Sequence, residues 1–240
     1  MHQMTPTGEN RILHSLPPSQ LSLLRPQLTL IDLKIGTVLH DAGTPVEYIY
    51  FPTSGMVSIL AIMRSGDAIE TAVIGREGVV GGMISVNGSQ PFGQNMVQIP
   101  GSALRIGAKP FLEALEASNG LRRLVNRYQS VVFLQAQQSA ACHAFHTIEA
   151  RLCRWLLHAA DATESERLDL TQEFLSQMLG VRRTSVTLIA HTLQKTGLIR
   201  YTRGKIEILD RAGVEECACE CYDVLRSEID KTFAAIELFN

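Results

Sequence analysis

The sequence predicts an α+β protein with three parts: an N-terminal antiparallel β-roll of the jelly-roll type, a long connecting helix, and a helical C-terminal region that contains a hairpin. Twelve of the 18 glycines lie between Gly36 and Gly107, among short apolar runs typical of tightly turning strands. A helical stripe of apolar residues follows, without Pro or Gly. The last third then has two short amphipathic helices before two strand-like runs.

The composition favours two folded domains. The chain has 240 residues, of which 45% are hydrophobic and 19% charged, so a disordered chain is excluded. No apolar run is long enough to span a membrane, and no membrane partner is expected. The first ten residues resemble no secretory signal. Five cysteines without a regular spacing favour a reducing environment, and we expect a cytoplasmic location.

The N-terminal half reads as short helices followed by strands. Pro17, Pro18 and Pro26 interrupt residues 10–28, which therefore predict short helical pieces. From residue 31 the pattern changes to apolar runs between turn residues. These runs include 37–39, 48–51, 56–60 and 68–74. Strands at this spacing predict a small antiparallel roll or barrel.

A jelly-roll metalloenzyme is the alternative from another functional class. Such an enzyme needs two or three histidines and a carboxylate inside the barrel to hold its metal. Of the seven histidines, only His40 falls in the strand region. We therefore expect no enzymatic activity and no cofactor.

A short helix around residues 111–115 and one long helix from residue 119 to His146 are expected next. The apolar stripe of the long helix comprises Leu121, Leu124, Val125, Tyr128, Val131, Val132 and Gln135. A one-sided apolar helix between two domains favours pairing with a partner helix. Alternatively, the stripe packs against the roll of its own chain.

Residues 171–199 predict a helix-turn-helix. Thr171 can cap the first helix, and Gly180 permits the tight turn after it. The apolar face of the first helix consists of Phe174, Leu175, Met178 and Leu179. The apolar face of the second consists of Val186, Ile189, Ala190 and Leu193. This pattern leaves Arg182 and Arg183 outward in the first turn of the second helix, where a DNA-reading helix meets base edges.

The segment after Gly197 predicts a wing beside this helix pair. Residues 198–209 form two strand-like runs joined by an Arg-Gly turn. Residues 171–205 carry six Lys or Arg side chains and a single acid, Glu173, whereas the whole chain has a net charge of −2. Positive charge is therefore concentrated where the phosphates of a bound duplex would lie.

These segments resemble the winged helix of the Crp/Fnr family of bacterial transcription regulators. The match includes 171–198 and continues through Ile199-Arg200-Tyr201 and Arg203-Gly204-Lys205-Ile206. The runs 36–39, 48–51 and 54–57 are similar to the opening hairpins of a cyclic-nucleotide-binding β-roll. The resemblance implies a β-roll sensor domain over 1–117, a dimerisation helix over 118–145 and a winged helix-turn-helix over 146–240.

The resemblance also implies partners and DNA contacts. Double-stranded DNA, a second copy of the chain and RNA polymerase are the expected partners, and a dimer would place two recognition helices about 34 Å apart. Arg183, Thr184 and Leu188 occupy the base-reading positions of the recognition helix. Only Arg183 matches the best-known residue pattern of the family, so the target DNA sequence should differ from the familiar one. Leu188 is suited to contact a thymine methyl. The other expected DNA contacts are Thr171, Arg182, Ser185, Thr187, His191, Arg203 and Lys205.

Cyclic nucleotide binding is not expected. Binders in this family use a glutamate for the ribose and an arginine for the phosphate. Here Gly82 stands where the acid should be, and Gln94 lies near the position of the arginine. Arg76 and Glu77 lie on the wrong side of the motif. A phosphate without a cation loses its main charge-assisted hydrogen bonds. A regulator that does respond to a cyclic nucleotide, or a small-molecule-binding roll whose helical domain binds proteins, remains the alternative.

The cysteines and histidines near residue 150 favour packing over metal binding. Adjacent side chains on a helix point apart, which argues against a site formed by Cys142, His143, His146 and Cys153. Residues 210–240 are expected to form a C-terminal helix, on which i, i+2 and i+4 positions cannot share one face. Those positions hold Cys217, Cys219 and Cys221. Nine acids against three bases from Glu207 onward predict that this region faces away from DNA.

Overall fold

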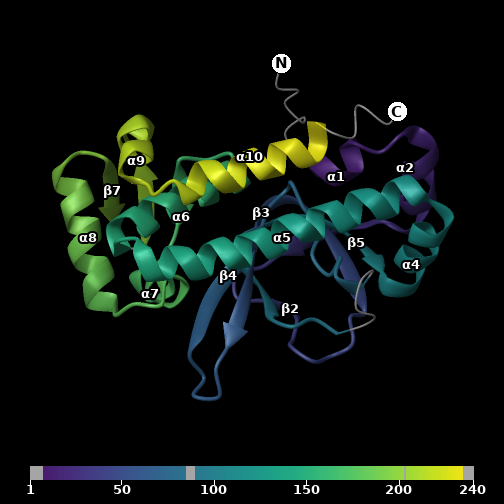
Figure 1. Ribbon diagram of the computed structural model, residues 1–240, viewed down its shortest axis with the longest axis horizontal. Helices are drawn as coiled ribbons and strands as arrows, with labels where there is room; N and C mark the ends of the chain where they lie inside the picture. The colour runs from purple at the N-terminus through teal and green to yellow at the C-terminus, as the bar shows by residue number, and fades with distance from the viewer. Residues whose placement is uncertain (1–7, 85–89, 203, 235–240) are drawn as a thin grey trace.

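The computed structural model describes residues 8–84, 90–202 and 204–234, which form a β-roll, a long helix and a winged helical region (Figure 1). The predicted order of the three parts is confirmed. No helix within these residues has the length and apolar character needed to cross a bilayer. Two main hydrophobic clusters hold the chain together, one inside the roll and one inside the winged region.

The roll is built on one antiparallel sheet. Its strands follow the order β1-β5-β3-β4, and β2 pairs with β5. The strands are β1 Thr29–Leu33, β2 Val38–His40, β3 Tyr48–Ile62, β4 Ala68–Ile74 and β5 Gln94–Gly107. The separate strands expected at 48–51 and 56–60 are instead one strand. Gly55, with φ +78°, bends β3 internally, and a Cβ there would lie 2.6 Å from the carbonyl oxygen of Ile99. Only glycine lets β5 approach so closely.

Short helices close one end of the roll, as the prolines predicted. They are α1 Arg11–His14, α2 Pro18–Leu24 and the 3-10 turn η1 Arg25–Gln27. Ile12 and Leu24 are fully buried in the cluster of the roll. Asn10 fixes this end, because its Oδ1 caps α1 at Leu13 while its Nδ2 donates to the carbonyls of Pro52 and Gly78 at 2.9 and 2.8 Å.

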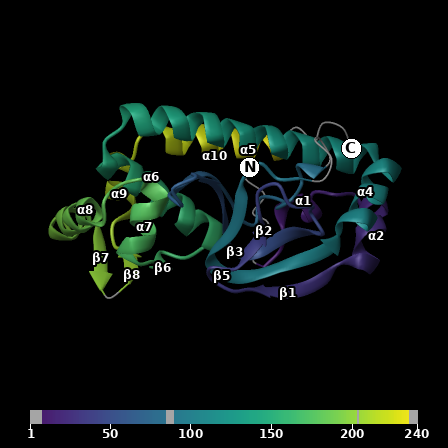
Figure 2. The same ribbon diagram turned by 90° about the horizontal axis from the view of Figure 1, so that it is seen from below.

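Helix α4, Ala108–Ala117, leads into α5, Asn119–Phe145, which runs across the molecule (Figures 1 and 2). Of the two packings expected for the apolar stripe, the structure shows the one against its own chain. Leu121, Leu124 and Val125 are buried in the cluster of the roll. Gln135 forms two hydrogen bonds with the backbone of Val73 in β4 (3.0 and 3.1 Å). The stripe is therefore occupied within one chain, and the opposite side of α5 faces outward.

The winged region follows α5. Its elements are α6 Ile148–Thr163, β6 Arg167–Asp169, α7 Gln172–Leu179, α8 Arg183–Lys195, β7 Ile199–Thr202, β8 Lys205–Ile208 and α9 Arg211–Cys217. Helix α6 ends at Glu164, which adopts a left-handed conformation (φ 50°). Met56, Leu60 and Ile99 of the roll share the cluster of this region, so the two parts are packed together.

The C-terminal segment is two helices rather than the single helix expected. Helix α9 ends at Ala218, which is extended (φ −72°, ψ 153°), and α10, Cys221–Ala234, begins after a short break. Helix α10 then runs back alongside α5 toward the roll (Figures 1 and 2). At its far end Phe233 packs in the cluster of the roll, and Asp230 pairs with Arg11 at 3.0 Å.

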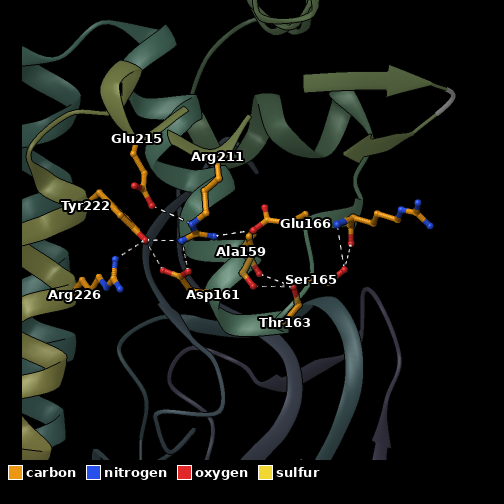
Figure 3. A network of polar contacts seen from close by, with 11 residues as sticks. Ala159, Asp161, Thr163, Ser165, Glu166, Arg211, Glu215, Tyr222 and Arg226 are labelled. Carbon is orange, nitrogen blue, oxygen red and sulfur yellow. Dashed lines mark hydrogen bonds and ion pairs between the residues drawn. The ribbon is translucent and has the colours of Figure 1, made fainter. Parts of the chain in front are cut away.

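A polar network ties α10 to the winged region (Figure 3). The guanidinium of Arg211 in α9 donates to Asp161 at 2.6 Å, to Glu166 at 3.1 Å and to Glu215 at 3.0 Å. It also donates at 2.8 Å to the hydroxyl of Tyr222 in α10, which in turn donates to Asp161. Arg211, the first residue of α9, therefore links the end of α6 with the start of α10.

Candidate nucleic-acid interface

Helices α7 and α8 form the predicted helix-turn-helix. The Oγ1 of Thr171 accepts the backbone N–H of Phe174 at 3.2 Å and so caps α7. Gly180 ends α7 in the left-handed conformation, with φ 60°. Helix α8 begins after Arg182, whose side chain makes no capping hydrogen bond. No side-chain acceptor therefore caps the first turn of α8.

The two faces of α8 differ as the spacing predicted. Val186, Ala190 and Leu193 are buried and fix the rotation of the helix in the cluster of the winged region. The opposite face is exposed except for Ser185, which is half-buried, and it carries Arg182, Arg183, Thr184, Ser185, Thr187, Leu188 and His191. Leu188 is 68% exposed on this face, so its apolar side chain is available for contact with a partner. Figure 1 shows α8 at the end of the molecule farthest from the roll.

The exposed face of α8 is only weakly engaged within the chain. Arg183 lies 4.0 Å from Glu173, and both side chains are mostly exposed. Such surface pairs contribute about 0–1 kcal/mol, so a phosphate or a base can replace Glu173 readily. The hydroxyl of Thr187 donates to Gln172 at 2.8 Å, which joins α8 to the start of α7.

The predicted wing is a small antiparallel sheet with the order β6-β8-β7. Lys205 lies 3.9 Å from Asp169 and is largely exposed at the tip. Arg203 lies outside the described residues. Arg200 forms an ion pair with Glu207 at 2.7 Å. The pKa of the Glu207 carboxyl is lowered, mainly by a hydrogen bond from Arg167. Glu207, two residues beyond the basic segment 171–205, therefore offsets part of the positive charge of the wing.

A buried polar contact joins the helix-turn-helix region to the roll, and the sequence did not reveal it. The carboxyl of Glu70 in β4 accepts from the Trp155 indole of α6 at 2.8 Å and from Ser58 at 2.5 Å. Burial raises the pKa of Glu70 to about 7. Nearby, Gln98 of the roll donates to the sulfur of Met178 in α7 at 2.8 Å. The signal available in the sequence was an acid in the middle of an otherwise apolar strand.

Side chains from α5 pack against the glycines of the segment that resembles a phosphate-binding motif. A Cβ on Gly82 would lie 2.4 Å from the amide nitrogen of Gln129, and one on Gly78 would lie 2.0 Å from the hydroxyl of Tyr128. Glu77 is half-buried, accepts from the hydroxyl of Tyr128 at 3.2 Å and has a pKa raised by the loss of solvent around its carboxyl.

The polar residues near this motif are engaged elsewhere. Arg76 forms an ion pair with Glu164 of the winged region at 2.7 Å. Gln94, which stands near the position of the expected arginine, donates to Asp41 at 3.1 Å.

Comparison with known proteins agrees with both halves of this architecture. A cyclic nucleotide-binding domain model matches residues 30–118, and a Crp-like helix-turn-helix domain model matches residues 150–217. A global nitrogen regulator from Synechocystis sp. is 25% identical over 175 residues, which are 69% of this chain and 78% of that protein.

Solved structures share the fold. FixK2 from Bradyrhizobium japonicum superposes with a TM-score of 0.68 at 15% identity, covering 80% of this chain and 98% of its own. A transcriptional regulator assigned to the Crp/Fnr family from Eubacterium rectale superposes with a TM-score of 0.64 at 19% identity, covering 86% and 96% of the two chains. The order of roll, long helix and winged helix defines a class of two-domain transcription regulators. This chain belongs to the Crp/Fnr family within that class.

Proposed function

We propose that the exposed face of α8 reads DNA in the major groove while the wing lies along the adjacent backbone. Arg183, Thr184 and Leu188 are assigned to base edges, with the guanidinium of Arg183 suited to guanine and Leu188 to a thymine methyl. The residues assigned to the backbone or to the rim of the groove are Thr171, Arg182, Ser185, Thr187, His191, Arg203 and Lys205.

One observation carries this proposal: the amphipathic rotation of α8. Its buried side is fixed by Val186, Ala190 and Leu193, so Arg182 and Arg183 must face outward at its N-terminal turn. Partial positive charge at a helix N-terminus adds to that of the two guanidinium groups. The same turn of a recognition helix is the part that meets bases in related motifs.

We further propose that the chain acts as a homodimer through the outward side of α5. This side carries Phe133, which is 65% exposed, and small residues that allow close helix approach, namely Ala140, Ala141 and Ala144. Two-fold symmetry about this helix would place the two copies of α8 about one DNA turn, roughly 34 Å, apart on a pseudo-palindromic site. RNA polymerase is the partner proposed for the DNA-bound dimer, and the cytoplasm is the proposed location.

The roll is proposed to be a sensor domain that does not respond to cyclic AMP. Support comes from Tyr128 and Gln129, which pack against the glycines of the phosphate-binding motif, and from the absence of an acid at Gly82. A ligand of another chemistry, or none, would then set the activity. The boundaries proposed for the three parts remain 1–117, 118–145 and 146–240.

Binding to duplex DNA should weaken steeply with salt. Each phosphate contact made by a Lys or Arg side chain releases a counterion, so the logarithm of the association constant falls by about 0.9 per contact for each tenfold increase in salt. Fluorescence anisotropy with a labelled random duplex measures this slope. Binding that is indifferent to salt, or no binding to duplex at any salt concentration, would contradict the proposed function and favour a protein-binding role for the winged region.

A further inference from the structure

Four potential metal ligands converge where α5 meets α6 and α10. They are the thiols of Cys142, Cys219 and Cys221 and the imidazole of His146, and one ligand atom from each lies within 4.8 Å of the others. The metal site considered from the sequence, and judged unfavourable, combined Cys142 and His146 with His143 and Cys153. In the folded chain, however, His143 bonds to the Ser139 carbonyl through Nδ1, and Cys153 is not part of the group.

The break between α9 and α10 brings these four residues together. Cys142 lies in the last turn of α5, and His146 caps that helix with its backbone N–H on the carbonyl of Cys142. The extended backbone at Ala218 turns the chain back toward this point. Cys219 and Cys221 therefore approach Cys142 from across the junction, which a continuous C-terminal helix would have prevented.

Two of the separations match the edges of a single tetrahedral site, and the whole group is compact enough to close around one ion. The sulfurs of Cys142 and Cys219 are 3.6 Å apart, and the sulfur of Cys221 is 3.5 Å from Nδ1 of His146. A tetrahedron with metal–sulfur bonds of about 2.3 Å and metal–nitrogen bonds of about 2.0 Å has edges of about 3.5–3.8 Å. The sulfurs of a cluster with several irons would stand farther apart, because they bind different metal atoms.

The surroundings of the four residues also match a metal centre. Nε2 of His146 lies 3.0 Å from the carboxylate of Glu220, an arrangement that fixes the tautomer and leaves Nδ1 free to bind a metal. Gln138 donates to the sulfur of Cys221 at 3.0 Å. The buried guanidinium of Arg154 interacts electrostatically with Cys142 and Cys219. A divalent ion with three thiolate ligands would carry a net negative charge, and this guanidinium would offset it.

We propose that Cys142, His146, Cys219 and Cys221 bind one thiophilic divalent ion of the Zn²⁺ type and thereby clamp α10 to the α5–α6 junction. Three thiolates with one imidazole form a common closed site for structural zinc. The junction joins the helix proposed for dimerisation to the winged region, and α10 connects both to the roll. A bound ion would hold α10 and the winged region in the arrangement seen here, and its removal would free the start of α10.

Metal content and cobalt spectroscopy of the full chain test this proposal. The protein, purified under reducing conditions without a metal-affinity tag, should carry about one equivalent of zinc by mass spectrometry. After removal of the metal, Co²⁺ should produce the visible bands of tetrahedral cobalt and the near-ultraviolet charge-transfer band of thiolate ligands. Added Zn²⁺ should displace the Co²⁺ and abolish these bands. Because metal binds the folded form, Zn²⁺ should also raise the Tm of the metal-free chain.

Matched variants identify the ligands. Cys219→Ser and Cys221→Ser should weaken Co²⁺ binding and reduce the charge-transfer band, whereas Cys217→Ser, which removes a neighbouring thiol outside the group, should leave both unchanged. Glu220→Ala should weaken Zn²⁺ binding about 10–100-fold by removing the partner of His146, whereas Glu216→Ala should not. Glu220 is 73% exposed, so this pair remains informative if the cysteine variants fail to fold.

Three results would overturn the proposal. The first is a wild-type chain that holds no stoichiometric metal and gives no thiolate–cobalt band. The second is a Cys217→Ser variant as impaired as Cys219→Ser. The third is iron with inorganic sulfide in place of a single ion, which would assign the four residues to a cluster.

Discussion

Replacing Arg183 with alanine is expected to weaken binding at the specific DNA site by about 1–3 kcal/mol and to relax the sequence preference there. The guanidinium lies in the first turn of α8, exposed and held only by a weak contact with Glu173. A bidentate contact with a base edge would be lost, while nonspecific phosphate contacts would remain. Titration of the variant against specific and random duplexes measures the two effects separately.

Lys205→Ala is the matched comparison, because it removes one exposed positive charge from the wing. A phosphate contact carries no direct sequence information, so this change should weaken binding to specific and random DNA alike and reduce the salt slope by about 1. If both variants lowered specific and random binding in the same proportion, Arg183 would not be a base-reading residue.

Glu70→Gln is expected to remove a pH dependence of stability worth about 3 kcal/mol. The carboxyl of Glu70 is buried between the roll and α6, and its pKa is raised from 4.5 to about 7. Between these pH values the folded chain keeps a proton that the unfolded chain has lost. Stability should therefore fall as pH rises from about 4.5 to about 7 and remain lower above that. The amide cannot ionise, yet it can replace the hydrogen bonds with Trp155 and Ser58.

Urea unfolding of the wild type and the variant at several pH values tests this expectation. Burial lowers the pKa of His158 to about 3, so protonation of the unfolded chain lowers the stability of the fold as pH falls below 6.5. This effect is opposite to that of Glu70 and is present in both chains. The difference in stability between the two chains therefore isolates the contribution of Glu70. Asp67→Asn, at an exposed site on the same hairpin, should leave the pH dependence unchanged. A Glu70→Gln chain that follows the wild type at every pH would show that Glu70 keeps an ordinary pKa.

Local patterns in the sequence predicted the winged region well. The spacing of Val186, Ala190 and Leu193 depends only on helix geometry, and the turn depends on Gly180 alone. The rotation of α8, and with it the exposed candidate DNA-binding face, could therefore be derived before the structure was known. The long helix was also found, but periodicity does not specify which surface covers an apolar stripe, and the stripe of α5 faces its own roll.

Features that depend on distant parts of the chain could not be predicted in this way. Cys142 and Cys219 are 77 positions apart, and they meet only because the chain breaks at Ala218. Glu70 reaches Trp155 only through the packing of the winged region on β4, at a separation of 85 positions. Such contacts depend on tertiary packing, which neither hydrophobic period nor residue type specifies.

Selection from a random duplex library, at two salt concentrations and with or without cyclic AMP, tests the central claim most directly. The account predicts that the purified chain enriches a pseudo-palindrome with half-sites about one DNA turn apart, and that cyclic AMP leaves this enrichment unchanged. Enrichment only in the presence of cyclic AMP would contradict the account of the roll around Gly82. Failure to enrich any sequence, under conditions where the chain is folded, would contradict the assignment of α8 as a recognition helix.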